Sequence, residues 1–414
     1  MRRDFHRYPE SAWTEFRTSS LVVKHLEELG YSLSVGLDTI ELQAVMGRPS
    51  QAEIISHIER AKRQGGDPAW IDRMREYPGV VATLKTGKSG PVVSLRFDMD
   101  CVDVDETKNS NHSPNKEGFA SVNELLMHAC GHDAHTAIGL GAAEVLMEKK
   151  SGLKGEIRLI FQPAEEGCRG AYAMTRKGVV DGSDYFLAMH IGGETPSGVF
   201  GINSVGHLCT TKFDVEFTGK SVHAAAAPNE GRNALLAAAA AVPSLYAIAP
   251  HRNGAMRVNV GTLNSGTGRN VIADKAFMKA ETRGATQEIA DYAYRRSQEV
   301  VNGAGAMYGV DVKVFMVGAG TDASGDAVLA EKVGKAINAS GIFREVHETV
   351  PSIGSEDATW MMLRVQETGG FALYMILGSD IEAPHHSSNF DMDESSMILG
   401  VKAILAIVEE LGMK

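Results

Sequence analysis

Four short apolar stretches, each followed at once by groups able to bind a cation, constrain this chain more than any other feature. They are VVSLRFDMD, ending in Asp98 and Asp100; EIRLIFQPAEEG, carrying Glu165 and Glu166; DYFLAMHIG, ending at His190; and FALYMILGSDIEAPHHSSNF, carrying His385 and His386. Apolar runs that alternate with helical stretches are typical of an α/β domain, a mostly parallel sheet with helices on both faces. Ligands bind outside the carboxyl ends of such strands, so these groups are predicted to converge in the fold.

The pattern changes between Cys209 and Val317, where the stretches read strand, helix, strand, strand, helix, strand. This order is typical of a compact ferredoxin-like βαββαβ unit inserted into the larger domain. We therefore predict a discontinuous metal-binding domain of residues 1–208 and 318–414 and an inserted domain of residues 209–317. The stretch TTKFDVEFTGK in the insert is predicted to be an edge strand, suited to pairing between the sheets of two subunits.

Composition excludes several classes of protein. A chain of 414 residues with 43% apolar and 22% charged residues can bury two cores, and its formal charge of −11 argues against non-specific nucleic-acid binding. No apolar run approaches the ~20 residues that cross a bilayer, and no apolar stretch near the start resembles a secretory signal. The 4 cysteines are too scattered for a disulfide framework, so we expect a cytoplasmic protein with free thiols.

The stretch LLMHACGHDAH places Cys130 and His132 two positions apart, just before a helix predicted to start near His135. Thiolate, imidazole and carboxylate are the usual ligands of zinc-type ions. With Glu166, His190 and one histidine of the pair at 385 and 386, they make about five ligands, more than one tetrahedral ion needs. We therefore predict two divalent ions roughly 3.5–4 Å apart, bridged by a compact thiolate.

Glu165 lies beside a predicted ligand, and a catalytic metal site needs a base that is not itself a ligand. A metal lowers the pKa of its bound water to about 7, so Glu165 is predicted to accept the proton of that water. The hydroxide then attacks a carbonyl group, and Glu165 protonates the departing nitrogen. This chemistry is amide hydrolysis. His128, His135 and His385 are expected to be hydrogen-bonded neighbours rather than ligands.

Several motifs, in order along nearly the whole chain, resemble the aminoacylase/carboxypeptidase family of two-metal hydrolases, in particular its amidohydrolase branch. They are RRDFHRYPE, LRFDMD, MHACGHDAHTA, IFQPAEEG, AMHIG, GKSVHAAAAP, GRNVI, GSEDA and HHSSNFDMDE. The resemblance implies Glu165 as general base and the metal ligands Cys130, His132, Glu166, His190 and His386. His386 is preferred to His385 because it stands where the branch has its histidine before a phenylalanine-aspartate stretch.

The resemblance also implies roles for three residues of the insert, which becomes a lid or dimerisation domain. His223 would reach the active site of a partner chain and steady the oxyanion, while Asn270 and Arg283 would hold the carboxylate end of the substrate. In the larger domain, Asp98 would support the ligands without binding metal. Arg96 stands where the wider family has a histidine ligand.

The implied function is that of a metal-dependent amidohydrolase acting on a small N-acyl amino acid. The first choice is p-aminobenzoyl-glutamate, cleaved to p-aminobenzoate and glutamate in folate catabolism, and hippurate and indole-acetyl amino acids stay open. So does a non-catalytic metal-binding subunit of a hetero-oligomeric hydrolase, although Glu165 and His223 argue against it. The soft thiolate and imidazole ligands favour zinc, and the resemblance equally suggests manganese. We expect a homodimer, or a heterodimer with a related subunit, formed through the insert, and no nucleic-acid or membrane partner.

Overall fold

The computed structural model describes residues 1–352 and 354–413, and its chain divides into two compact units. One unit is Met1–His207 with Ala323–Lys414, and the other is Leu208–Asp322. The second boundary between the units lies after Asp322 rather than after the predicted position 317. The reason is that the last strand of the insert continues beyond a bulge between Met316 and Gly318. No helix of the described ranges is long and apolar enough to cross a membrane.

The larger unit contains an eight-stranded sheet in the order β1-β2-β4-β3-β5-β12-β6-β11. Its strands are β1 (Ser32–Val35), β2 (Val80–Lys85), β3 (Val92–Asp98), β4 (Glu156–Gln162), β5 (Tyr185–Ile191), β6 (Val199–Val205), β11 (Glu345–Pro351) and β12 (Phe371–Leu377). β1, β2 and the contact of β12 with β6 are antiparallel, and the remaining pairs are parallel. The predicted class, a mostly parallel α/β sheet, is confirmed.

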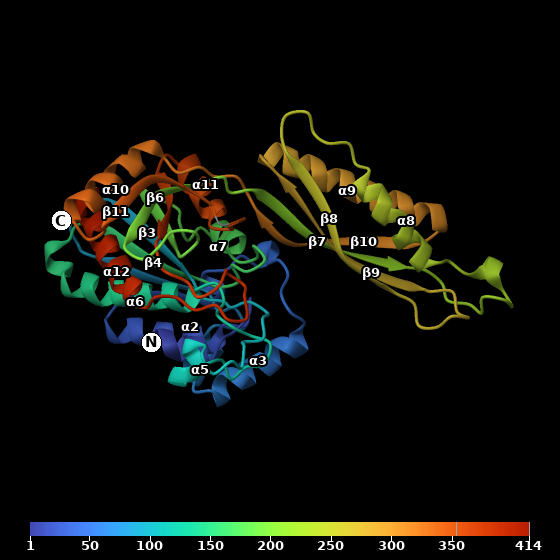
Figure 1. Ribbon diagram of the computed structural model, residues 1–414, viewed down its shortest axis with the longest axis horizontal. Coiled ribbons are helices and arrows are strands. Elements are labelled where there is room, and N and C mark those ends of the chain that lie inside the picture. Colours follow the sequence, from blue (N-terminus) through green and yellow to red (C-terminus); the bar gives the residue numbers. More distant parts are fainter. Residues whose placement is uncertain (353, 414) are drawn as a thin grey trace. The chain divides into compact units, whose positions relative to one another are not determined.

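Helices cover both faces of this sheet (Figure 1). The helices of this unit are α1 (Arg2–Arg7), α2 (Phe16–Glu28), α3 (Gln51–Arg63), α4 (Pro68–Arg73), α5 (Ser113–Glu117), α6 (His132–Glu148), α7 (Ala171–Lys177), α10 (Ala327–Ser340), α11 (Thr359–Glu367) and α12 (Ser395–Val408). Successive strand side chains point to opposite faces. In β5, Leu187 joins the core that contains α2, α6, α10 and α12, whereas its neighbour Phe186 joins the core that contains α7 and α11.

The four strands singled out in the sequence are neighbours in the sheet. The run β4-β3-β5-β12 is parallel throughout, so all four carboxyl ends lie at the same edge. Residues 46–74 contain α3 and α4, which begin at the side-chain caps of Ser50 and Asp67. These helices pack beside α2.

The smaller unit has the predicted βαββαβ order. It consists of β7 (Cys209–Thr218), α8 (Ala234–Tyr246), β8 (Met256–Ser265), β9 (Lys275–Gly284), α9 (Gln287–Tyr308) and β10 (Asp311–Gly320). The expectation that TTKFDVEFTGK is an edge strand is wrong. This stretch forms β7, which pairs with β10 on one side and β9 on the other, so the edges are β10 and β8.

Candidate metal centre and active site

A tight turn brings Cys130 and His132 to the carboxyl edge of the sheet. Helix α6 begins at His132 rather than near His135, because Gly131 adopts a left-handed conformation (φ 88°) and occupies the N-cap position. A Cβ at Gly131 would lie 2.6 Å from Cγ2 of Ile191, so both the conformation and the close approach require glycine. Cys130 and His132 are both buried.

Potential ligand atoms form two triplets that share one sulfur. Cys130 groups with His132 and His190, and the same Cys130 groups with Glu166 and His386, with all ligand atoms of a triplet within 4.8 Å of one another. All five ligands implied by the sequence resemblance therefore come together. A shared thiol at the junction is the arrangement that two bridged cations need.

The two buried imidazoles are oriented by backbone carbonyls. Nδ1 of His132 donates to the carbonyl oxygen of Asp100 at 2.8 Å, and Nδ1 of His190 donates to the carbonyl oxygen of Ile191 at 2.8 Å. This fixes the tautomer in which each Nε2 is unprotonated, and Nε2 of His190 lies 3.5 Å from Sγ of Cys130. Nε2 of His132 is buried without a hydrogen-bond partner in the part of the chain that the structure describes. Such an orphaned acceptor fits a cation.

His386, and not its neighbour, faces the shared sulfur. Its backbone has a φ of 65°, uncommon for a residue with a side chain, and its N–H donates to the carbonyl oxygen of Ala129 at 2.7 Å. Nε2 of His386 lies 3.3 Å from Oε1 of Glu166. Nε2 of His385 instead accepts from the N–H of Gly193 at 3.0 Å.

The expectation of hydrogen-bonded neighbours holds for His135 and His385 but is wrong for His128. Nε2 of His135 accepts from the N–H of Ile191 at 2.9 Å, so its Nδ1 carries the proton and donates to Asp98 at 2.5 Å. Neither nitrogen of His128 has a hydrogen-bond partner among the described residues, and burial lowers its pKa to about 3. Burial of an imidazole that makes no hydrogen bond to the described residues explains that shift.

The carboxylate of Asp100 binds the backbone N–H groups of both Glu165 and Glu166. Oδ1 of Asp100 accepts from the N–H of Glu165 at 3.0 Å, and Oδ2 accepts from the N–H of Glu166 at 2.8 Å. The Glu165 carboxylate is buried, 4.0 Å from Nε2 of His132. Burial, and then the charge of the nearby Glu356, raise the pKa of Glu165 well above its usual value.

A buried ionic cluster lies beside Glu165, and of its members only Asp98 was given a role from the sequence. Arg96 donates to Asp98 at 2.6 Å and to Glu356 at 2.9 Å, and it lies 3.3 Å from Asp357. Carboxylate oxygens of Glu165, Glu356 and Asp357 lie within 4.8 Å of one another. Glu356 and Asp357 belong to the motif GSEDA, which the sequence comparison of motifs had singled out. Only the fold shows that both carboxylates lie beside Arg96.

The pKa values of the surrounding histidines diverge. Hydrogen bonding to Cys130, and then to Glu166, raises the pKa of His386 to about 10. Burial, and then the charge of His135, lower the pKa of His190 well below its usual value. The two imidazoles thus sit in opposite surroundings, since burial favours the neutral form of His190 and the hydrogen bonds of His386 favour its protonated form.

The three site candidates of the insert belong to the other unit. His223 is exposed, and its Nδ1 accepts from the N–H groups of Ala225 and Ala226 at 3.2 Å. Arg283 lies on β9 and donates to Glu281 of the same strand at 3.1 Å. Asn270 is exposed.

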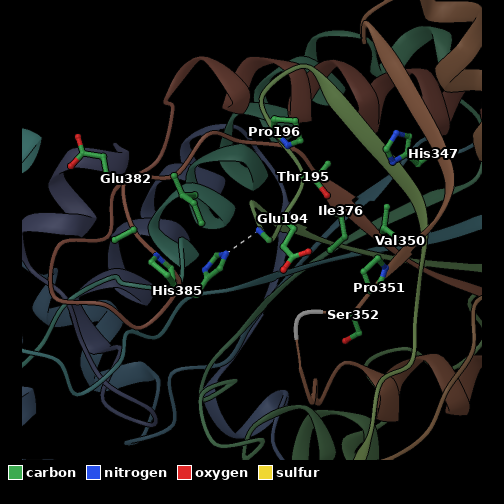
Figure 2. A pocket seen from close by; sticks show the side chains of 14 residues that line it. Glu194, Thr195, Pro196, His347, Val350, Pro351, Ser352, Ile376, Glu382 and His385 are labelled. Carbon is green, nitrogen blue, oxygen red and sulfur yellow. Dashed lines mark hydrogen bonds between the residues drawn. The ribbon is translucent and has the colours of Figure 1, made fainter.

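A cavity of about 800 Å³ adjoins the metal-binding groups through His385 (Figure 2). Its wall combines the loop after β5 with residues of β11, β12 and the segment 381–385. Val350, Ile376 and Ile381 contribute apolar surface, and Glu194 and Glu382 contribute carboxylates. Sequence reasoning did not predict this cavity, because its lining residues share no motif.

Fold and side-chain chemistry together define a metal-dependent hydrolase of amide bonds. More narrowly, the chain belongs to peptidase family M20/M25/M40, whose sequence profile matches residues 94–410. The resemblance drawn from the sequence motifs is thereby confirmed.

Individual relatives cover almost the whole chain. One of the subunits of the p-aminobenzoyl-glutamate hydrolase of Escherichia coli (strain K12) is 47% identical over 405 residues, which are 97% of this chain and 93% of the relative. The indole-3-acetyl-aspartic acid hydrolase of Enterobacter agglomerans is 46% identical over 405 residues, with the same coverage of 97% and 93%. The crystal structure of an aminobenzoyl-glutamate utilization protein from Klebsiella pneumoniae superposes with a TM-score of 0.84 at 41% identity, covering 99% of this chain and 94% of that one.

Proposed function

We propose that this protein hydrolyses the amide bond of a small N-acyl amino acid, with p-aminobenzoyl-glutamate as the first-choice substrate. The observation that carries the proposal is the pair of ligand triplets sharing Cys130, with the Glu165 carboxylate 4.0 Å from Nε2 of His132. The relatives named as hydrolases of p-aminobenzoyl-glutamate and indole-3-acetyl-aspartate support the substrate class.

Cys130, His132, Glu166, His190 and His386 would hold two divalent cations, manganese or zinc. When bound, such ions polarise an amide carbonyl and lower the pKa of water. The orphaned lone pair of His132 and the thiol common to both triplets support this assignment. His135 supports it indirectly, because its bond to Asp98 keeps that carboxylate oriented beside the site.

Glu165 is the general base and acid. Its carboxylate accepts the proton of the attacking water and returns it to the departing nitrogen, while the neighbouring Glu166 serves as ligand. Asp100 accepts hydrogen bonds from the backbone N–H groups of both residues and so fixes their positions. The two adjacent carboxylates can therefore have different roles. Arg96 and Asp98 position this edge of the sheet.

In the smaller unit, His223 donates a hydrogen bond to the oxyanion of the substrate bound by a partner chain. Since its Nδ1 accepts from backbone N–H groups, Nε2 carries the proton and faces solvent as a donor. Asn270 and Arg283 hold the carboxylate end of the substrate. These roles require a dimer. One relative is named as part of a hydrolase with more than one kind of chain, which makes a related second chain as good a partner as a second copy. Four free thiols suit a cytoplasmic location.

The test is release of p-aminobenzoate and glutamate by the purified chain loaded with Mn²⁺ or Zn²⁺, alone and mixed with candidate partner chains. Glu165→Gln is expected to lower kcat by about 10²–10⁴-fold while the metal content per chain stays at the wild-type value. A matched control is Glu382→Gln, a carboxylate on the adjacent cavity that bonds to Ser113. Undiminished turnover in Glu165→Gln, or an inert protein with every metal and partner, contradicts the proposal.

A further inference from the structure

The cavity beside the metal-binding groups has the make-up of a small-molecule site. Pockets of about 300–1,000 Å³ with mostly apolar walls and a few polar groups are typical of such sites, and this one measures about 800 Å³. Val350 and Ile376 form buried parts of its wall, and Pro351, Ile381 and Pro384 add apolar surface. It reaches His385, the neighbour of His386. A substrate amide at the metal-binding groups therefore has room here for one large flat substituent.

The carboxylate of Glu194 is one of the polar groups that line this cavity. Figure 2 shows it pointing into the open space, whereas the carboxylate of Glu382 points away. Oε1 of Glu382 accepts from the Ser113 hydroxyl at 2.8 Å. The carboxylate of Glu194 has no hydrogen bond to any residue of the described ranges.

The backbone around Glu194 is held on both sides. The N–H of Gly193 donates to Nε2 of His385 at 3.0 Å, and the carbonyl oxygen of Thr195 accepts from the N–H of Ser379 at 2.9 Å. Glu194 thus projects from an anchored loop directly after β5. Glu194 is exposed, and the fixed backbone on either side of it keeps its carboxylate at this part of the cavity wall, within reach of a bound ligand.

We propose that this cavity binds the aromatic acyl half of the substrate, and that Glu194 selects aromatic rings bearing their own N–H donor. The inference rests on the proposed function and deepens it. The acyl groups in the names of the two relatives share this chemistry, since an aminobenzoyl group and an indole-acetyl group are both flat and apolar with an N–H on the ring system. A carboxylate accepts such an N–H well because charge strengthens the hydrogen bond.

The experiment compares two substrates that differ only in the donor, p-aminobenzoyl-glutamate and benzoyl-glutamate. The measured quantity is the ratio of their kcat/KM values in the wild-type protein and in Glu194→Ala. The electronic effect of the amine on the amide is the same in both proteins and cancels. Glu194→Ala is expected to lower the ratio by about five- to tenfold, and Glu194→Gln, which keeps a neutral acceptor, by less. Glu382→Ala is the matched control and is expected to leave the ratio unchanged.

An unchanged ratio in Glu194→Ala overturns the inference while leaving the proposed function intact, and so does an equal fall in Glu382→Ala. If the wild-type protein, offered every metal and partner chain, hydrolyses neither substrate, the proposed function fails. The inference is then decided by calorimetric binding of 4-aminobenzoate and benzoate. Wild-type protein is expected to prefer the amine-bearing ligand about five- to tenfold more than Glu194→Ala does, and equal preference overturns it.

A second variant tests the cavity itself. Pro351 is exposed at the end of edge strand β11, on the cavity wall and away from the metal-binding loops. Pro351→Trp fills part of the cavity and is expected to lower kcat/KM for both aryl substrates at least about tenfold relative to acetyl-glutamate. An equal effect on acetyl- and aryl-glutamate would show that the acyl half lies elsewhere.

Discussion

Replacement of Arg96 by methionine should destabilise the larger unit strongly and more so at high pH. Arg96 is 2% exposed and donates to Asp98 at 2.6 Å and to Glu356 at 2.9 Å. Methionine has similar length but no charge, so it leaves buried carboxylates without a cation. Removing one partner from a buried ionic group costs about 3–5 kcal/mol, and we expect the free energy of unfolding to fall by that amount.

The pH dependence follows from the sign of the pKa shift. Burial raises the pKa of Asp357 from 3.8 to about 8, although Arg96 opposes the rise. An acid whose pKa is higher in the folded state loses stability as the pH increases from its unfolded value through its folded value. Without Arg96 the opposing effect disappears. The loss caused by Arg96→Met should therefore be larger near pH 8.5 than near pH 6.

Urea unfolding followed by tryptophan fluorescence, on protein kept metal-free by a chelator, measures this difference. All 3 tryptophans, Trp13, Trp70 and Trp360, belong to the larger unit, so the signal reports on that unit. Arg364→Met is the matched control, because Arg364 pairs with Asp181 at the exposed surface and should shift the midpoint very little. A loss equal to the control, or one that shrinks as the pH rises, would refute the reasoning.

Three further outcomes are expected. Cys130→Ser should reduce bound metal to below one ion per chain by mass spectrometry, since both triplets use that sulfur, whereas Cys209→Ser in the other unit should not. Chelation should lower the melting temperature, because an ion present at 100 times its Kd stabilises the folded state by about 2.7 kcal/mol, and an unchanged temperature would count against a bound metal. Although burial raises the pKa of Glu106, hydrogen bonds from His6 and His112 lower it overall. The stability lost in Glu106→Gln at pH 7 should thus shrink as the pH falls below about 4.5 and through the lowered pKa of Glu106 in urea titrations, and a constant difference would contradict the assignment.

Strand ends were predictable from the sequence because burial on both faces makes parallel strands continuous apolar runs. The residue after each run must then lie at the carboxyl edge, which is why Glu166 and His190 were found together. The start of α6 was missed because Gly131 looked like part of a loop, whereas its left-handed conformation begins the helix. The position of β7 was missed because a strand's own residues indicate its faces and not its neighbours.

Other parts of the site depend on contacts that no local pattern carries. The buried Arg96 bonds residues about 260 positions away, at Glu356 and Asp357, so its partners emerge only from the fold. His128 lies in the same short stretch as the predicted ligands Cys130 and His132. The sequence therefore does not show that its imidazole lacks a hydrogen-bond partner among the described residues. Glu194 follows a strand end, but nothing in its neighbours distinguishes it from an ordinary surface carboxylate.

The place of β12 in the sheet has a consequence for how the molecule is made. This strand lies between β5 and β6, although it is among the last to leave the ribosome. While the whole insert is being synthesised, the position between β5 and β6 is therefore empty, and the facing edges of both strands lack their hydrogen-bonding partner. Late synthesis of that partner makes slow, chaperone-dependent maturation the expected behaviour in cells, and ions can be loaded only after translation has passed the segment carrying His386.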